Sequence, residues 1–333
     1  MQKTCLIIGG GGYCGSYIVK KLLEENWKIE VFDTFWYETK FKKNKNLSLI
    51  KGDVRDKDKI IKIFKNHENV IHLACISNDA SFVLDEKLST SVNLDSFEPV
   101  VAAAKNSGVK RFIFASSSSV YGVSKEKNVK EDHPLLPITL YNKYKGMCES
   151  VLKKYTSDEF TTVIFRPATV CGYSSFRQRL DLSVNILTNF AINKNKIIIF
   201  GGSQVRPNLH INDYYDLCKT LLIAPKEKIH GQIFNYGAEN MSIIELAERT
   251  AAVVKKHFNL KNDIKLEIQP SDDIRSYHIN SDKIKEVLAI SPKFTVNDAI
   301  KDLCYAFENK KIPDSFNNNI YYNVRRMKEL NIK

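Results

Sequence analysis

The sequence predicts an α/β protein with a doubly wound parallel sheet and a smaller C-terminal α/β domain. Three observations support this. Apolar strand-like segments alternate with helical ones over the first half, a glycine-rich turn joins the first strand to the first helix, and longer loops begin after about residue 166. We therefore expect one domain over residues 1–170 and a second over 171–333, with some segments of the second returning to the first.

The first elements form a strand, a glycine turn and a helix. Residues 4–8 are apolar, residues 16–25 have helical periodicity, and Gly9, Gly12 and Gly15 between them have the spacing G-x-x-G-x-x-G, with Tyr13 and Cys14 before the last glycine. Such a turn lets the backbone approach a pyrophosphate at a helix N-terminus, where free N–H groups and the dipole favour anions. This predicts a dinucleotide site of the Rossmann type.

The second strand, over residues 28–32, ends at Asp33, which lies 18 residues after Gly15. An acid at this place can accept hydrogen bonds from both ribose hydroxyls and would repel a 2′-phosphate. The predicted cofactor is therefore NAD rather than NADP.

The remaining elements continue the alternation. Further strands are expected at 47–51, 69–74, 111–115 and 161–165, with helices near 56–66, 93–107 and 141–155. In the second half we expect helices near 181–193, 212–223, 242–258, 282–289 and 296–308, and strands at 197–200 and 265–268. This half should cover the carboxyl ends of the sheet strands, where ligands bind in such folds.

Composition narrows the class of protein. Of 333 residues, 43% are hydrophobic, the first strand begins close to Met1, and no apolar run reaches the ~18 residues of a membrane span, so we expect a cytoplasmic enzyme without a signal peptide or membrane contact. Seven scattered cysteines without a C-x-x-C pair speak against a metal site or disulfide framework. The net charge of +12 suits anionic ligands, but the lysines are interspersed with Asn, Ile and Glu, so no nucleic-acid partner is expected.

Tyr141, Lys145 and Ser117 are the candidate catalytic residues. Tyr141 and Lys145 are four residues apart and so share a helix face, and Ser117 follows the strand at 111–115. A phenol has a pKa of about 10, but a cation at ~4 Å contributes roughly 4 kcal/mol at an effective dielectric of about 20. That is up to about three pKa units, enough to bring Tyr141 near pH 7. The trio therefore predicts a hydride-transfer site.

With these motifs assembled, the chain resembles over nearly its full length the extended short-chain dehydrogenase/reductase superfamily, in its branch of nucleotide-sugar epimerases, dehydratases and dehydrogenases. The resemblance implies cofactor contacts from Asp53 and Val54 to adenine, and from the His-Leu-Ala-Cys run that contains Leu73 and Ala74. It also implies an active-site asparagine at Asn93 and a nicotinamide contact at Pro167.

The resemblance further implies a nucleotide-diphosphate sugar as substrate. Arg206, in the run from 200 to 213, would bind the diphosphate with help from Asn185 and Arg275, while Ser117 and Ser118 would lie at the sugar. It also suggests a homodimer in which the helices near 93–107 and 141–155 pair as a four-helix bundle.

The implied reaction is oxidation of the sugar at C4, in surface polysaccharide sugar synthesis. Tyr141 would take the hydroxyl proton, Ser117 would bind the reacting oxygen, and Lys145 would hold Tyr141 ionised and contact the nicotinamide ribose. The 4-keto sugar could be re-reduced (4-epimerase), dehydrated (4,6-dehydratase) or released (4-dehydrogenase), and a 4-ketoreductase would run the step in reverse. Serines 118 and 119 replace the acid pair of dehydratases, which argues against elimination. An NAD-binding scaffold or sensor would be expected to lose the trio, which this chain keeps.

Overall fold

A seven-stranded parallel sheet forms the centre of the molecule. The computed structural model describes residues 2–124, 126–271 and 275–332. The sheet order is β10-β6-β5-β4-β1-β2-β3, with every neighbouring pair parallel. Its strands are β1 (Thr4–Ile8), β2 (Lys28–Asp33), β3 (Leu47–Lys51), β4 (Asn69–His72), β5 (Arg111–Ala115), β6 (Thr161–Pro167) and β10 (Gln232–Tyr236). The predicted fold class, an α/β doubly wound sheet, is confirmed.

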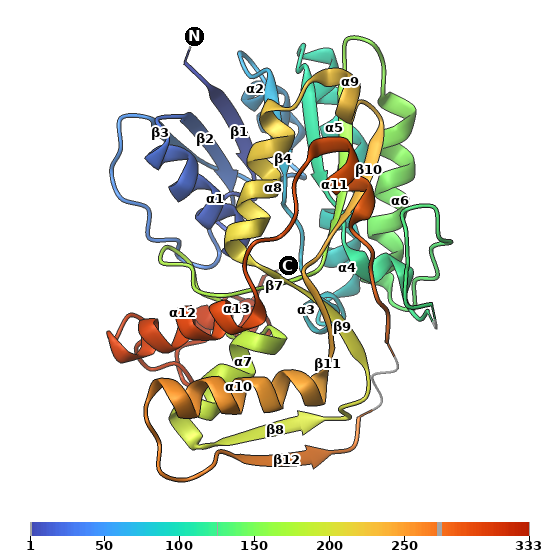
Figure 1. The fold of residues 1–333 in the computed structure, drawn as a ribbon. Coiled ribbons are helices and arrows are strands. Elements are labelled where there is room, and N and C mark those ends of the chain that lie inside the picture. The colour runs from blue at the N-terminus through green and yellow to red at the C-terminus, as the bar shows by residue number, and fades with distance from the viewer. Residues whose placement is uncertain (1, 125, 272–274, 333) are drawn as a thin grey trace.

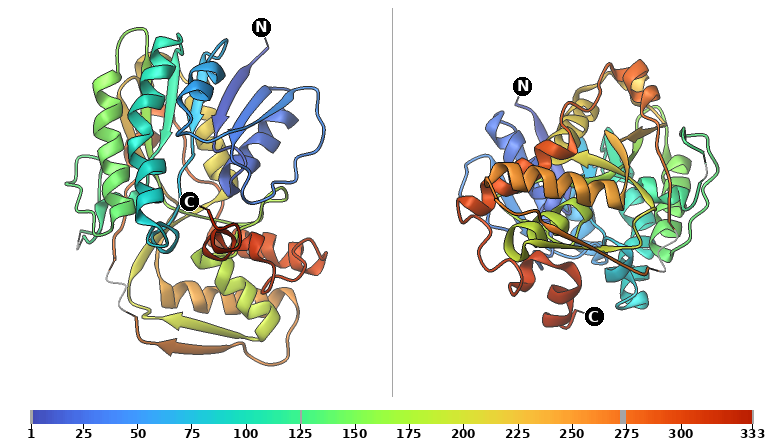
Figure 2. Two further views of the ribbon diagram at one scale, coloured as in Figure 1. Left: turned by 180° about the vertical axis from the view of Figure 1, so that it is seen from behind. Right: turned by 60° about the horizontal axis from the view of Figure 1, so that its bottom comes forward.

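Helices cover both faces of this sheet (Figures 1 and 2). Strand β1 shows why: Cys5 and Ile7 pack into one apolar core with α1 (Tyr13–Glu24) and α8 (Ile211–Ile223). Leu6 and Ile8 pack into a second core on the opposite face. That core is completed by α2 (Lys57–Ile63), α5 (Phe97–Asn106) and α6 (Leu140–Tyr155). Since side chains alternate along a strand, a strand buried on both faces is apolar throughout.

Two segments of the second half belong to the central sheet or its cover. Helix α8 packs beside α1, and β10 pairs with β6 in the register Gln232 to Val163. From the sequence we expected the helix but no strand at 232–236. Strand β10 was not predicted because a five-residue run shows little periodicity by itself, and because its pairing partner, β6, lies about 70 residues earlier in the chain.

Most of the remaining second half forms the lower part of the molecule in Figure 1, whereas the short helices at 226–229 and 282–288 lie above it, next to β6 and β10. Helices α7 (Ser183–Lys194), α10 (Ile243–His257) and α12 (Val296–Glu308) share an apolar core with β8 (Lys196–Phe200). Strand β8 pairs in parallel with β12 (Lys265–Gln269). A three-stranded sheet has the order β11-β9-β7, from Glu239–Ser242, Val205–His210 and Thr169–Cys171.

Several smaller elements were not expected from the sequence. They are α3 (Asp79–Phe82), α4 (Glu86–Thr90), α9 (Lys226–Ile229), α13 (Asn323–Glu329), and the single turns η2 (Ser118–Tyr121) and η3 (Asn319–Tyr321). Helix α11 (Asp282–Leu288) was expected, and it ends one residue before the predicted boundary at 289. The helix expected at 93–107 is preceded by a π-helical turn, η1 (Ser91–Asp95), and begins properly at Phe97. Strand β4 ends at His72, two residues before the expected end.

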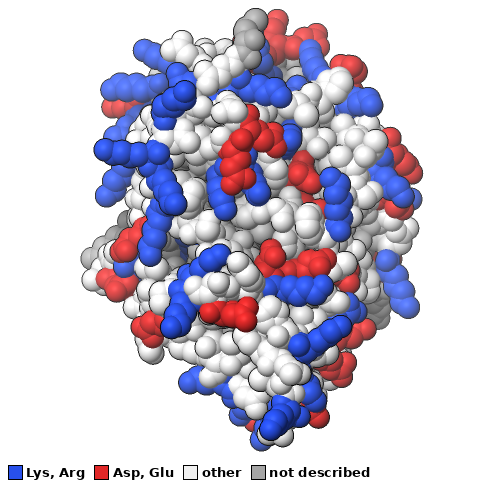
Figure 3. Space-filling model, turned by 60° about the vertical axis from the view of Figure 1, so that its left-hand side comes forward, with Lys and Arg blue, Asp and Glu red and all other residues white. Residues whose placement is uncertain are grey.

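The surface carries both signs of charge. On the face shown in Figure 3, basic side chains are interspersed with acidic ones. Among the described residues, no helix combines the length and apolar character needed to cross a bilayer.

Candidate active site

One large cavity, of about 650 Å³, lies where the carboxyl ends of the sheet strands face the second half of the chain. The residues that follow β1, β2, β4, β5 and β6 all line it, as expected for ligand sites in parallel α/β sheets. Seventeen of the residues singled out in the sequence line it: Gly9, Gly12, Tyr13, Cys14, Gly15, Asp33, Asp53, Val54, Leu73, Ala74, Ser117, Ser118, Tyr141, Lys145, Pro167, Arg206 and Arg275. Asn93 and Asn185 are not among the lining residues.

The glycine loop has the form that a dinucleotide requires. Gly9 has φ +84°, and a Cβ there would collide with the backbone of Ala74, while a Cβ on Gly15 would collide with the Gly9 carbonyl. Gly12 is the N-cap of α1 and supplies no side chain, and no acid occupies the first turn. The free N–H groups at this helix end have no acidic side chain in their own first turn, so the positive end of the helix dipole is not neutralised from within the helix.

Asp33 closes the loop from the end of β2. One carboxylate oxygen accepts a hydrogen bond from the Gly11 N–H at 2.8 Å and the other from the Phe35 N–H at 2.7 Å. Burial raises the pKa of Asp33, and these two bonds oppose that rise. The carboxylate is thus fixed in position at the cavity wall.

Asp53, predicted at the adenine, forms an ion pair with Arg55 at 2.8 Å. Burial acts to raise the pKa of Asp53, but the bonds and charge of Arg55 lower it overall. Val54, Leu73 and Ala74 supply apolar wall beside it. His72, in the run expected to line the cofactor, instead points into the core beneath the sheet, where it packs against Phe97, Phe112 and Phe114.

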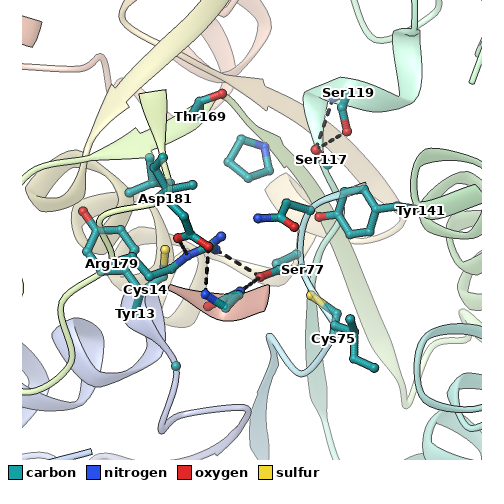
Figure 4. Close-up of a pocket in the computed structure, with 18 of the residues that line it drawn as sticks. Tyr13, Cys14, Cys75, Ser77, Ser117, Ser119, Tyr141, Thr169, Arg179 and Asp181 are labelled. Carbon is teal, nitrogen blue, oxygen red and sulfur yellow. Dashed lines mark hydrogen bonds and ion pairs between the residues drawn. The ribbon is translucent and has the colours of Figure 1, made fainter. Parts of the chain in front are cut away.

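Two of the three predicted catalytic residues, Ser117 and Tyr141, lie across the cavity from Cys14 and Arg179 (Figure 4), and Lys145 lines the same cavity. Tyr141 and Lys145 come from the first turns of α6, whose N-cap Thr139 accepts a hydrogen bond from the Asn142 N–H. Lys145 is 6% exposed and its ammonium donates to the Ala115 carbonyl at 2.7 Å. The Ser117 hydroxyl lies 2.7 Å from that of Ser119.

The electrostatic state of Tyr141 differs from the expectation. Burial raises the pKa of the phenol well above its ordinary value, and Cys75 and Asp79 raise it further, while Arg179 lowers it. Burial therefore outweighs the nearby cations in this arrangement, and the expected lowering of this pKa toward 7 is not seen.

Serines occupy the two positions after Ser117. The Ser119 hydroxyl donates to the Asn142 side chain at 2.6 Å, and Ser118 is hydrogen-bonded to Tyr277. A carboxylate that does line the cavity, Asp79, is already engaged by the Thr139 hydroxyl and by an ion pair with Arg275. We find no free acid pair beside Ser117 in the described part of the chain.

Two of the predicted substrate residues lie at the side of the cavity formed by the second half. Arg206 is placed by β9, and its guanidinium donates to the carbonyls of Val205 and Arg275. Arg275 is held in turn by Asp79. The two cations are thus linked at one place in the cavity wall.

Asn93 and Asn185 brace loops rather than face the cavity. The Asn93 side chain bonds both the N–H and the carbonyl of Ile76. Asn185 is fully buried; it accepts from the Gly172 N–H and donates to the Arg179 carbonyl. The direct diphosphate contact expected for Asn185 is not supported by this geometry, because both ends of the amide are used within the protein.

Sequence reasoning missed a group of polar residues that line the same cavity: Arg177, Arg179, Asp181 and Asn323. The first three come from the segment after β7, and the last comes from the start of α13. A signal was present in the run Arg-Gln-Arg-Leu-Asp at 177–181, where two arginines and an acid fall within five residues.

Comparison with known proteins identifies the family. The model of the NAD dependent epimerase/dehydratase family matches residues 5–237, well over half of the chain. The chain belongs to this family. The resemblance stated from the sequence is confirmed at this level, and with it NAD as the cofactor.

Relatives in the family have different reactions. The chain is 27% identical over 318 residues to a human dTDP-D-glucose 4,6-dehydratase, covering 90% of this chain and 88% of that protein. It is 26% identical over 319 residues to a UDP-glucose 4-epimerase of Lactobacillus helveticus, covering 89% and 94%. A solved UDP-glucuronic acid 4-epimerase of Bacillus cereus, in complex with UDP-glucuronic acid and NAD, has a TM-score of 0.81 at 23% identity, covering 92% and 99%.

The residues that line the cavity of this protein fit NAD. The backbone of the glycine loop leaves room only for hydrogen at Gly9 and Gly15, and Asp33 stands beside it. The buried guanidinium of Arg177 has nitrogen atoms without a hydrogen-bond partner among the described residues. Within the described ranges, no cluster of three or more His, Cys, Asp or Glu could hold a metal ion.

Proposed function

We propose that the protein oxidises the sugar of a nucleotide-diphosphate hexose or heptose at C4, and that the 4-keto sugar is either re-reduced, as in a 4-epimerase, or released, as in a 4-dehydrogenase. The observation that carries the proposal is the common cavity. Ser117 and Tyr141 line it together with Asp33 and the glycine loop. A substrate hydroxyl and a nicotinamide can therefore meet within reach of an acid-base residue.

When bound, NAD accepts a hydride from the sugar carbon and can return it. The protein supplies the proton chemistry: Tyr141 takes the proton of the reacting hydroxyl and Ser117 holds the oxygen. The raised pKa of Tyr141 means that the phenol needs added positive charge to ionise. The cationic groups of the cavity, Lys145 and Arg179, are the protein's contribution to that charge.

Substrate binding is assigned to Arg206 and Arg275. Guanidinium groups pair bidentately with phosphate oxygens, and both side chains line the cavity on the side away from the glycine loop. Their roles rest on the family resemblance together with this location. Two names among the relatives, UDP-glucose 4-epimerase and dTDP-D-glucose 4,6-dehydratase, agree with a nucleotide-sugar substrate.

A 4,6-dehydratase is the second candidate, because the human relative at 27% identity carries that name. Elimination needs one group to take the C5 proton and another to protonate the leaving hydroxyl. Here the two positions after Ser117 are serines, and Ser119 is already bonded to Asn142. This chemistry favours oxidation without elimination.

The test is to mix the purified protein with UDP-, dTDP-, GDP- and CDP-linked hexoses and heptoses while recording NADH absorbance and identifying the sugar products. A 4-epimer without net NADH would establish an epimerase, and NADH with a released 4-keto sugar a dehydrogenase. A 4-keto-6-deoxy product would instead establish the dehydratase. No conversion of any sugar, with NAD bound, would contradict the proposal.

A further inference from the structure

Arg177 and Arg179, called here the arginine pair, form a second cationic group in the cavity. Both line it, and they are only 4% and 7% exposed. Nε and Nη1 of Arg177 and Nη2 of Arg179 have no hydrogen-bond partner among the described residues. Burying a guanidinium N–H without a partner is unfavourable, so these atoms indicate an anion that the fold is built to accept.

The remaining contacts of the arginine pair fix it in place. The Arg177 guanidinium stacks 4.3 Å from the ring centre of Tyr37, and Nη2 donates to Asn323 at 2.5 Å. Arg179 is held by Asp181 at 2.7 Å and by the Ser77 hydroxyl at 3.0 Å. Figure 4 shows Arg179 and Asp181 beside Cys14 of the glycine loop, across the cavity from Ser117. The pair is therefore preorganised rather than mobile.

The carboxylates nearby do not satisfy the pair. Asp181 bonds Arg179 and the Asn323 N–H, and Asp33 bonds the backbone at Gly11 and Phe35. The described residues provide no carboxylate hydrogen-bonded to Arg177. The positive end of α1 adds to the same local field, because Gly12 caps it without a side chain and its first turn holds no acid. The unpaired guanidinium N–H groups and the N-terminus of α1 both favour an anionic ligand.

Two ligands expected in this cavity carry such an anion: the dinucleotide has a pyrophosphate, and the nucleotide sugar has a diphosphate. Position favours the dinucleotide: Arg177 packs on Tyr37, four residues after Asp33 at the end of β2, and its charge reaches Asp33 and Cys14. The nucleotide-sugar diphosphate has its own cations in Arg206 and Arg275. We infer that Arg177 and Arg179 bind the pyrophosphate of NAD together with the N-terminus of α1.

This inference rests on the NAD dependence of the family and not on the proposed sugar reaction. The measurement is therefore calorimetric binding of NAD, ADP-ribose and adenosine to the protein freed of bound cofactor. ADP-ribose keeps the pyrophosphate and lacks nicotinamide, and adenosine lacks phosphate. Arg177→Gln and Arg179→Gln should each weaken NAD and ADP-ribose by about 10- to 100-fold, as for a lost charge-assisted hydrogen bond, and leave adenosine unchanged.

Three controls make the experiment decisive. Arg177→Lys keeps the positive charge but not the planar guanidinium that can donate two parallel hydrogen bonds, so its loss of NAD affinity should be smaller than that of Arg177→Gln. Arg249→Gln, on the exposed face of α10 and paired with Glu239, should change nothing. The melting temperature of each variant without ligand shows whether it folds; if Arg177→Gln does not, Arg177→Lys carries the comparison.

Unchanged NAD affinity in both glutamine variants would overturn the inference. So would an equal loss for adenosine, which would indicate a distorted cavity. A third contrary result is weaker binding of UDP, dTDP, GDP or CDP to the NAD-loaded variants with NAD affinity intact, because the pair would then serve the substrate. If no nucleotide sugar is converted but both glutamine variants bind NAD more weakly, the inference about the arginine pair holds and only the proposed reaction is contradicted.

Discussion

Tyr141 is the residue on which the proposed chemistry depends, and its burial makes the neutral phenol the favoured form. We predict that Tyr141→Phe lowers turnover by about 10²- to 10⁴-fold, the usual contribution of a positioned acid-base group, while NAD affinity is unchanged. Single-turnover kinetics with the substrate found in the sugar panel, together with NAD titration, measures both quantities. Turnover equal to that of the wild type would remove Tyr141 from the mechanism.

The Asp33 carboxylate accepts hydrogen bonds from the backbone at Gly11 and Phe35, and we expect it also to select NAD over NADP. Asp33→Ala should weaken NAD by about tenfold or more and relax discrimination against NADP, because the ribose acceptor and the charge that repels a 2′-phosphate are both lost. Asp33→Asn is the matched control. It keeps an acceptor for the Gly11 or Phe35 N–H and should relax discrimination with less loss of NAD affinity. A variant as selective as the wild type would show that the acid is misassigned.

At the scale of elements, a buried ion pair joins α6 to β6. Arg166 bonds both carboxylate oxygens of Glu149, at 2.6 and 2.9 Å, and Ser116 donates to the same carboxylate. Glu149→Gln should destabilise the protein by about 3–5 kcal/mol, since it leaves a buried guanidinium without its counter-charge. Urea unfolding measures this change. The double variant Arg166→Met/Glu149→Met should recover part of it, and a loss under about 1 kcal/mol would mean the pair behaves as an exposed one.

Strand β4 introduces a pH dependence through His72. Burial, and then the charge of Lys145, lower the pKa of His72 to about 3 from an ordinary 6.5. The unfolded chain therefore binds a proton that the folded protein rejects, so stability is fully present above about pH 6.5 and is lost as the pH falls toward 3, by up to about 1.4 kcal/mol per pH unit. In His72→Phe the free energy of unfolding should fall less steeply between those values. Parallel pH curves for the two proteins would contradict this assignment.

At the scale of the whole molecule, the homodimer implied by the family resemblance stays a prediction. Helices α5 and α6 lie together on one face of the sheet, and Met147 on α6 is 41% exposed. If these helices form a four-helix bundle, sedimentation equilibrium should give twice the chain mass, and Met147→Glu should shift the protein toward monomer. A wild-type protein that sediments as a monomer would contradict the predicted homodimer. The division of function near residue 170 is likewise still a prediction.

Much of the fold could be predicted because its signals are local. The first six strands of the central sheet each have an apolar run bounded by turn residues, and the sequence placed all of them. Strand β10 and helix α13 lacked such signals. Their positions depend on partners far away in the chain: β6 for the strand, and Arg177, Asp181 and Ser77 for Asn323 at the start of the helix. Periodicity in a short window carries no information about such contacts.

The glycine loop, Asp33 and the helical spacing of Tyr141 and Lys145 can be read from the sequence alone, because turn conformation and the helix period follow from neighbouring residues. The tertiary structure alone decided which side chains face the cavity. It turned Asn185 inward, brought the arginine pair to the glycine loop, and bonded Lys145 to a backbone carbonyl. Burial and the distances between residues remote in sequence set these outcomes, since desolvation and charge interactions depend on what packs around each group.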